Sequence, residues 1–226
     1  KLPLKTQLES AFDLPVTIIN DAAAAAWAEY CAIQTIATDG THSTDTKTKA
    51  NDDTLVYITV STGIGGGMIQ NGQLITSTDG FCAHLGHVSV QHNNRQSITC
   101  HCGRINCAEA IASGTAIARQ ASLILNKKVS CKRVFEHYLA VPKIAELIDD
   151  ASSAVCDLIA SVKAITGTNT IILGGSVGSS PTFQQQVISK VALLPPIYQV
   201  NIELPQTGAN ADLIGAMLYT KKLNKI

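Results

Sequence analysis

Four residues in the middle of the chain have the types and the spacing of a zinc site. Three cysteines form a Cys-x-Cys-x4-Cys pattern, and a histidine lies upstream of them. Three thiolates and one imidazole complete the tetrahedral shell that protein-bound Zn2+ prefers. The ligands that we expect are Cys100, Cys102, Cys107 and His87, which follows Gly86 in a predicted strand. The other histidines considered as the fourth ligand are His84, His92 and His101. His101 is the least suitable of them, because it lies between two cysteines and would be strained in reaching the ion.

Glu109 follows the last of these cysteines by two residues and has no place left in a full zinc shell. A closed shell of four protein ligands is typical of a structural zinc site, whereas a catalytic site keeps one position open. We therefore expect the metal to shape a pocket that Glu109 faces, without taking part in the chemistry. The alternative is a purely structural zinc clip that has no link to function.

Asn20 and Asp21 follow a short β-branched segment, residues 16–19, that predicts a buried strand. An alanine-rich helix is expected to begin directly after them. The helix dipole favours a carboxylate at this point, so one interpretation is that Asn20 or Asp21 only caps the helix. The position also suits a base that accepts a hydroxyl proton during phosphoryl transfer.

Two glycine-rich segments follow predicted strands. Residues 61–67 read Ser-Thr-Gly-Ile-Gly-Gly-Gly, in which glycines let backbone amides approach an anion and hydroxyls add donors. No Gly-Lys-Ser/Thr follows, so this is not a Walker loop, and a tight β-hairpin would need the same glycines. Residues 174–176 read Gly-Gly-Ser. These glycines would let an adenine or a ribose lie flat on the backbone, or would form a plain strand-to-helix turn.

The composition of the 226 residues is that of a folded protein with balanced charge. Apolar residues make up 46% and charged residues 15%, and seventeen basic residues balance seventeen acidic ones. Without a basic stripe, we expect no nucleic-acid partner. Apolar stretches such as residues 22–28 are too short and too rich in alanine to span a membrane. Seven cysteines, three of them at metal-ligand spacing, favour a reducing compartment, and we expect a cytoplasmic protein.

The predicted elements alternate between strands and helices, which indicates an α/β fold. Strands are predicted at residues 16–19, 55–60, 170–173 and 200–204, with an Asn-Gly hairpin over residues 68–75. Helices are predicted at residues 4–12, 22–36, 151–166 and 211–218, and one more begins at about residue 181. Helical patterns also dominate residues 108–150, with breaks near residues 127–130 and at residue 142. Residues 38–53 predict a surface loop. Strands that end in glycine or aspartate turns before helices indicate a parallel or mixed sheet with ligands at its carboxyl end.

Five motifs occur here in the order in which one family carries them. They are Leu-Pro-x4-Asn-Asp-Ala, Ser-Thr-Gly-x-Gly-Gly-Gly, Gly-x3-His-x-Gly-His, Cys-x-Cys-Gly-x3-Cys-x-Glu and Gly-Gly-Ser. On these motifs, nearly the whole chain resembles the ROK family of bacterial sugar kinases and sugar-responsive repressors. The resemblance implies the actin-like ATPase and hexokinase fold (ribonuclease H-like), mainly its C-terminal lobe, with a mixed sheet, flanking helices and a zinc loop. His84 stands where most ROK sugar kinases carry glutamate, so the chain looks most similar to the N-acetylmannosamine kinases.

The resemblance implies a reaction and a role for each motif residue. The reaction is ATP-dependent phosphorylation of the 6-hydroxyl of N-acetylmannosamine, a step of sialic acid catabolism, with Mg2+ bound to ATP and with structural zinc. Asp21 would be the catalytic base toward that hydroxyl. The residues that would bind the sugar are Asn20, Asp21, His84, His87 and Glu109. The residues that would contact ATP are Thr62 and Gly63 at the phosphates, and Gly174 and Gly175 beside the adenosine.

The resemblance also implies how the chain is divided. Residues 1–21 would be a remnant of an N-terminal lobe, 22–208 the C-terminal lobe with a zinc loop at 87–107, and 209–226 a helix returning toward the N-terminal lobe. The family's phosphate loop, Asp-x-Gly-Gly-Thr-Lys, is not found in these 226 residues, so we expect them alone to be inactive as a kinase. Asn106 replaces a family glycine before the last cysteine; asparagine tolerates a left-handed backbone, so we expect the zinc loop to form.

Two other activities of the same family stay open at this point. One is a sugar-responsive repressor that lacks its DNA-binding part here, although the Asn-Asp pair and the Ser-Thr-Gly loop favour a kinase. The other is a glucokinase or fructokinase, which would differ only in substrate and against which His84 argues. The resemblance further implies that the partners are a small-molecule sugar and ATP, with no nucleic acid and no membrane, and that the protein is a homodimer.

Overall fold

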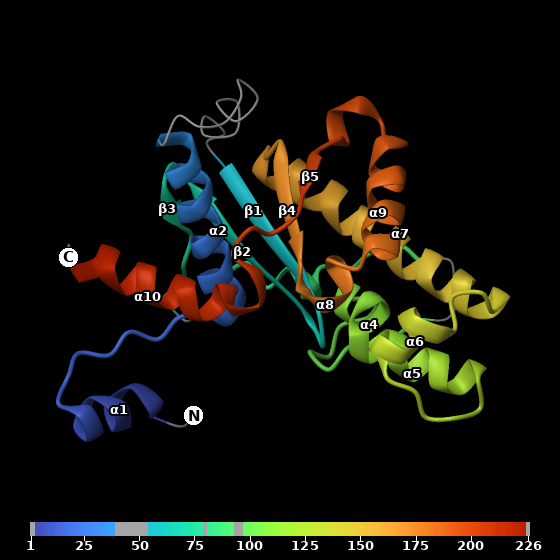
Figure 1. The fold of residues 1–226 in the computed structure, drawn as a ribbon, viewed down its shortest axis with the longest axis horizontal. Coiled ribbons are helices and arrows are strands. Elements are labelled where there is room, and N and C mark those ends of the chain that lie inside the picture. Colours follow the sequence, from blue (N-terminus) through green and yellow to red (C-terminus); the bar gives the residue numbers. More distant parts are fainter. Residues whose placement is uncertain (1–2, 39–53, 79–80, 93–96, 225–226) are drawn as a thin grey trace.

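A mixed five-stranded sheet runs through the part of the chain that the computed structural model describes, residues 3–38, 54–78, 81–92 and 97–224. The strands are β1 (Thr54–Val60), β2 (Ile64–Gln70), β3 (Gln73–Leu74), β4 (Thr170–Gly174) and β5 (Asn201–Glu203). Their order is β3-β2-β1-β4-β5, as Figure 1 shows. β1 pairs antiparallel with β2 and parallel with β4, and β4 pairs parallel with β5. The predicted mixed sheet is therefore confirmed.

The central strands are mainly apolar because both of their faces are covered. β1 reads Thr-Leu-Val-Tyr-Ile-Thr-Val, and every residue of β4 is buried. The predicted hairpin after β2 is confirmed: Asn71 and Gly72 both have positive φ, 49° and 70°, as a two-residue type I′ turn requires. β2 begins already at Ile64, so the last three glycines of the Ser-Thr-Gly-Ile-Gly-Gly-Gly segment lie inside a strand. That segment forms a tight hairpin between β1 and β2.

Helices cover both faces of the sheet and enclose two apolar cores (Figure 1). The α-helices are α1 (Leu4–Phe12), α2 (Asp21–Thr38), α4 (Ala108–Ala112), α5 (Gly114–Ile124), α6 (Cys131–His137), α7 (Pro142–Thr166), α8 (Gly175–Gly178), α9 (Pro181–Ala192) and α10 (Ala211–Asn224). The short 3-10 helices are η1 (Leu85–His87), η2 (Pro196–Tyr198) and η3 (Gly208–Asn210). α2 and α10 pack on one face, while α4, α5, α7 and α9 bury the other. No helix in the described ranges is both long enough and apolar enough to cross a membrane.

Three expectations about the elements are wrong. Residues 16–19 form no strand; Ile18 is 55% exposed, and none of the described strands pairs with this segment. Residues 142–166 form one helix, because the buried positions recur at helical spacing through residue 151 without interruption. His87 ends the 3-10 helix η1 and does not lie in a strand. The expected loop at residues 38–53 lies, apart from its first residue, outside the described residues.

The close contact between α2 and α10 is possible because α10 carries a glycine, Gly215, where the two helices cross. A Cβ placed on Gly215 of α10 would overlap the backbone carbonyl of Ala24 in α2. The alanine-rich sequence of α2 allows this close approach, because small side chains bring two helix backbones together. Gly215 and Ala24 are both buried at the crossing. The two helices therefore form a tightly joined pair beside the sheet.

A buried carboxylate joins the same helix pair to the loop after β5. Glu29 of α2 is fully buried and accepts hydrogen bonds from the backbone amides of Gln206 (2.7 Å) and Thr207 (3.0 Å). The Thr207 hydroxyl donates a further bond to it. The buried carboxylate thereby has hydrogen-bond donors for both of its oxygens. The bonds fix the loop that leads into η3.

The variant Glu29→Gln tests this anchor. A glutamine presents an NH2 group to one of the donors, so we expect the free energy of unfolding to fall by about 2 kcal/mol. Urea denaturation measures the change. The matched control is Glu136→Gln on α6, where the side chain is 46% exposed, and it should change stability by less than about 0.5 kcal/mol. Equal losses in both variants would contradict the role given to Glu29.

Candidate functional site

A cavity of about 940 Å³ lies at the carboxyl ends of β1, β4 and β5. Open α/β sheets bind their ligands at this edge, so its position agrees with the prediction from the order of the elements. The sequence-predicted site residues that line it are Asn20, Asp21, Thr62, Gly63, His84, Glu109 and Gly175. The structure thus brings these predicted residues together from five separate segments of the chain. Of the predicted site residues, Gly174, His87 and the three cluster cysteines are not among those that line it.

Asn20 and Asp21 start α2 at the cavity, and they have different local roles. The Asn20 side-chain oxygen accepts a hydrogen bond from the Ala23 amide at 3.2 Å, and its backbone oxygen accepts one from Ala24. Asn20 is therefore the N-cap of the helix. Asp21 accepts a bond from the adjacent Ala22 amide at 2.8 Å, and it is exposed. A carboxylate in the first turn is favoured by the helix dipole and here remains accessible to a ligand.

Glu109 lies in α4 and contacts the turn of the β1–β2 hairpin. Its Oε2 atom accepts a hydrogen bond of 3.0 Å from the backbone amide of Ile64. A Cβ on Gly63 would lie 2.6 Å from the same oxygen, so only glycine allows the carboxylate to approach this closely. The hairpin turn and Glu109 therefore form one wall of the cavity.

The same turn is bound from behind by the start of α5. The amides of Gly114 and Thr115 donate to the carbonyl oxygens of Ser61 (2.7 Å) and Thr62 (3.2 Å). The Thr115 hydroxyl adds a second bond to the Thr62 oxygen at 2.8 Å. These oxygens already have donors, so they repel an anion in the cavity less than unpartnered carbonyls would. The turn is held in place by backbone bonds at both of its ends.

Gly174 has a different environment from its neighbour Gly175. Gly175 lines the cavity, whereas Gly174 is buried and a side chain on it would collide with the Tyr57 ring. Tyr57 and Thr59 lie two residues apart on β1 and so face the same side of the sheet. Burial raises the pKa of the Tyr57 hydroxyl above its usual range. The glycine pair thus makes room for polar side chains of β1 below the cavity.

Several cavity residues were not predicted from the sequence. They are Tyr57, Thr59, Ser179 and Asp212. Two hydroxyl-bearing residues at alternate positions of a buried strand, Tyr57 and Thr59, are a signal that could have been used. Asp212 is an acid in the first turn of α10, as Asp21 is in the first turn of α2. The Ser61 and Ser176 hydroxyls lie 3.2 Å apart and join the hairpin turn to α8.

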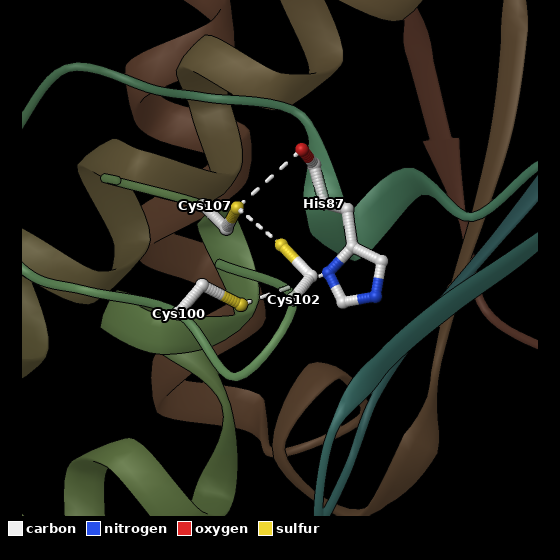
Figure 2. A group of neighbouring side chains, drawn as sticks. All are labelled: His87, Cys100, Cys102 and Cys107. Carbon is white, nitrogen blue, oxygen red and sulfur yellow. Dashed lines mark hydrogen bonds between the residues drawn. The ribbon is translucent and has the colours of Figure 1, made fainter. Parts of the chain in front are cut away.

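The four expected zinc ligands form one cluster, shown in Figure 2. The ligand atoms all lie within 4.8 Å of one another. The Cys100 Sγ atom is 3.7 Å from His87 Nδ1, and the Sγ atoms of Cys102 and Cys107 are 3.6 Å apart. Zn–S bonds of about 2.3 Å and Zn–N bonds of about 2.0 Å require ligand separations of about 3.5 to 3.8 Å in a tetrahedron. The arrangement fits a tetrahedral zinc ion.

The electrostatics of the cluster also fit a cation. Burial, reinforced by the neighbouring thiols, raises the pKa of Cys107 to about 12. A divalent cation would offset the repulsion between neighbouring thiolates, because it stabilises the charged form of each thiol. Asn106 has a φ of 56°, so the expectation that asparagine would adopt a left-handed backbone before Cys107 is confirmed. Its side-chain oxygen accepts a bond of 2.9 Å from the Ile98 amide, which holds the loop together.

The cluster is connected to the cavity in two ways. Cys107 directly precedes α4, so the position of the cluster determines where the helix that carries Glu109 begins. His87 directs Nδ1 toward Cys100, and its ring lies parallel to the ring of His84 with centroids 6.1 Å apart. His84 lines the cavity. Bound zinc would supply a crosslink that fixes this wall, without being exposed to a ligand in the cavity.

Comparison with known proteins identifies the class of protein that this fold and site define. The model of the ROK family matches residues 1–222, and the chain belongs to this family. An N-acetylmannosamine kinase from Citrobacter koseri is 38% identical over 220 residues, which are 97% of this chain and 69% of that protein. The resemblance seen in the motifs is therefore confirmed, and the relatives support a sugar kinase.

Solved structures show the same fold. A ROK hexokinase from Thermus thermophilus has a TM-score of 0.77 at 27% identity, covering 98% of this chain and 73% of that one. A ROK family glucokinase from Streptomyces griseus, solved with glucose and AMPPNP, has a TM-score of 0.69 at 24% identity, covering 95% and 70%. The fold is that of the actin-like ATPases and hexokinases, as the sequence predicted.

The metal content of cysteine variants tests the zinc site. We expect the purified protein to hold about one Zn2+ per chain, and Cys100→Ser to lose it during dialysis against a chelator that leaves the parent loaded. Cys31→Ser, a thiol in α2 outside the cluster, should keep the parent's zinc content. Mass spectrometry of the metal in dialysed samples gives the stoichiometry. A parent protein without zinc, or equal zinc in both variants, would contradict the assignment.

Proposed function

We propose that the intact protein transfers the terminal phosphate of ATP to the 6-hydroxyl of N-acetylmannosamine. The observation that carries this proposal is the gathering of Asp21, Glu109 and His84 with the hairpin turn in one cavity. The ROK relative from Citrobacter koseri, named as an N-acetylmannosamine kinase, supports the choice of sugar. Support for a kinase also comes from the exposed carboxylate at the start of α2, because a sensor of sugar needs no base.

Asp21 is the base in this proposal. It accepts the proton of the 6-hydroxyl as the oxygen attacks the phosphorus atom. Asn20, Glu109 and His84 bind the remaining hydroxyls and the amide of the sugar, so that the attacking oxygen is aligned. His87 would hold zinc through Nδ1 and would offer its other nitrogen toward the sugar side. Because phosphoryl transfer has a loose transition state, alignment and charge neutralisation provide most of the rate.

The nucleotide occupies the opposite end of the cavity in the same proposal. Thr62 and Gly63 contact the phosphates through the hairpin turn, and Mg2+ arrives with ATP. Gly175 borders the adenosine. Gly174 does not contact it but leaves room for the Tyr57 ring beneath the backbone of this turn. We also propose that the protein is cytoplasmic, because the free thiols in the described residues agree with a reducing compartment. We further propose that it is a homodimer, which light scattering can measure.

Replacing the base tests the mechanism. In the intact protein, Asp21→Asn should lower kcat for N-acetylmannosamine by about 10²- to 10⁴-fold and leave the KM for the sugar within a few fold. Asp13→Asn is the matched control: it removes an exposed carboxylate outside the cavity, and its left-handed backbone suits asparagine. Coupled ADP release measures both variants. An unchanged kcat in Asp21→Asn would contradict the role given to Asp21. A parent protein that binds the sugar without turnover would favour the repressor.

The absence of the phosphate-loop motif from residues 1–226 leads to a second expectation. These residues by themselves should show no sugar-dependent release of ADP, whereas the intact protein should. Glucose, fructose and N-acetylmannosamine are compared at equal concentrations in the same assay. Sugar-dependent turnover by residues 1–226 alone would contradict this part of the proposal. Faster turnover of glucose or fructose by the intact protein would replace the proposed substrate.

A further inference from the structure

Three aromatic rings lie nearly parallel beside the cavity. The rings of Phe81 and His84 are stacked, with centroids 4.4 Å apart and an interplanar angle of 7°. The rings of His84 and His87 have an interplanar angle of 2° and centroids 6.1 Å apart. Phe81 is 65% exposed and belongs to neither apolar core. The stack on His84 therefore lies outside both apolar cores.

The backbone around His84 is closely fixed. Ala83 has a positive φ of 53°, and the Leu85 amide donates to the Ala83 carbonyl at 2.7 Å, which closes a tight turn with His84 at its centre. The His87 amide then donates to the His84 carbonyl at 3.0 Å. Gly86 packs directly against the backbone of Ile64 in β2. The backbone thus sets where the His84 side chain begins, but not the plane of its ring.

The ring plane of a histidine needs a separate restraint. The χ2 torsion of histidine is broad, because it joins a tetrahedral carbon to a flat ring. The hydrogen bonds of an imidazole lie in the plane of its ring, so the plane decides which ligand atoms it can reach. His87 is oriented by the metal cluster through Nδ1. Phe81 is the ring that stacks on His84 itself.

We propose that Phe81 is a positioning residue for sugar recognition: it holds the His84 imidazole parallel to His87, so that the edge of the His84 ring meets the polar groups of the sugar. This inference rests on the proposed function, because it takes the ligand at His84 to be the sugar. Phe81 itself need not touch the sugar. Its effect is to reduce the number of ring orientations that binding must select.

The test compares Phe81→Leu with a matched control, Phe12→Leu, in the zinc-loaded intact protein. Phe12 of α1 is 66% exposed, so both variants remove an exposed ring and keep an apolar side chain. Phe81→Leu should raise the KM for N-acetylmannosamine roughly 2- to 10-fold, the range that one aromatic pair corresponds to. The kcat, the KM for ATP and the zinc content should stay unchanged. Phe81→Tyr keeps the stacked ring and should behave like the parent.

A spectroscopic signal separates positioning from a general loss of structure. The ring protons of His84, assigned by their loss in His84→Gln, should move downfield in sugar-free Phe81→Leu, because the ring current of the phenyl group is gone. Phe12→Leu should leave them in place. Unchanged His84 signals, an unchanged sugar KM in Phe81→Leu, or the same KM increase in Phe12→Leu would each overturn the inference. A parent protein that does not phosphorylate this sugar refutes the proposed function instead, and the His84 signals then decide the positioning alone.

Discussion

The hydrogen bond from the Ile64 amide to the Glu109 carboxylate joins two segments that are 45 residues apart. One is the start of β2 after the hairpin turn, and the other is α4, which begins where the metal cluster ends at Cys107. The bond is possible because Gly63 leaves space beside the carboxylate. The proposed phosphate side and the proposed sugar side of the cavity are therefore positioned by one contact. A metal ion held by the four clustered side chains would act on the cavity through this contact, because Cys107 directly precedes the first residues of α4.

The start of α2 shows that a structural role and a chemical role can be divided between neighbours. Asn20 satisfies the amides of the first turn, and Asp21 is left exposed at the cavity. An N-cap and an accessible carboxylate were alternatives when only the sequence was considered. They are compatible in the structure because capping uses one side chain and the helix dipole favours the charge of the next.

Features that depend on local geometry could be predicted from the sequence, whereas those that depend on distant neighbours could not. The β2–β3 turn follows from Asn71-Gly72, and the three clustered cysteines follow from their spacing, because both are set within a few residues. The cavity position follows from the strand order. A strand at residues 16–19 was expected from β-branched residues alone, but a strand requires a partner to pair with. The stack of Phe81 on His84 could not be predicted either, because side-chain orientation around a turn leaves no periodic pattern in the sequence.

The missing side chain at Gly215 has a mechanical consequence. Where backbone meets backbone, α10 cannot slide along α2 without lifting off the Ala24 carbonyl, so the two helices can shift only as one body. The first turns of both helices, with Asp21 and Asp212, border the same cavity. A ligand that displaces the start of α10 would consequently also displace the start of α2, which carries Asp21.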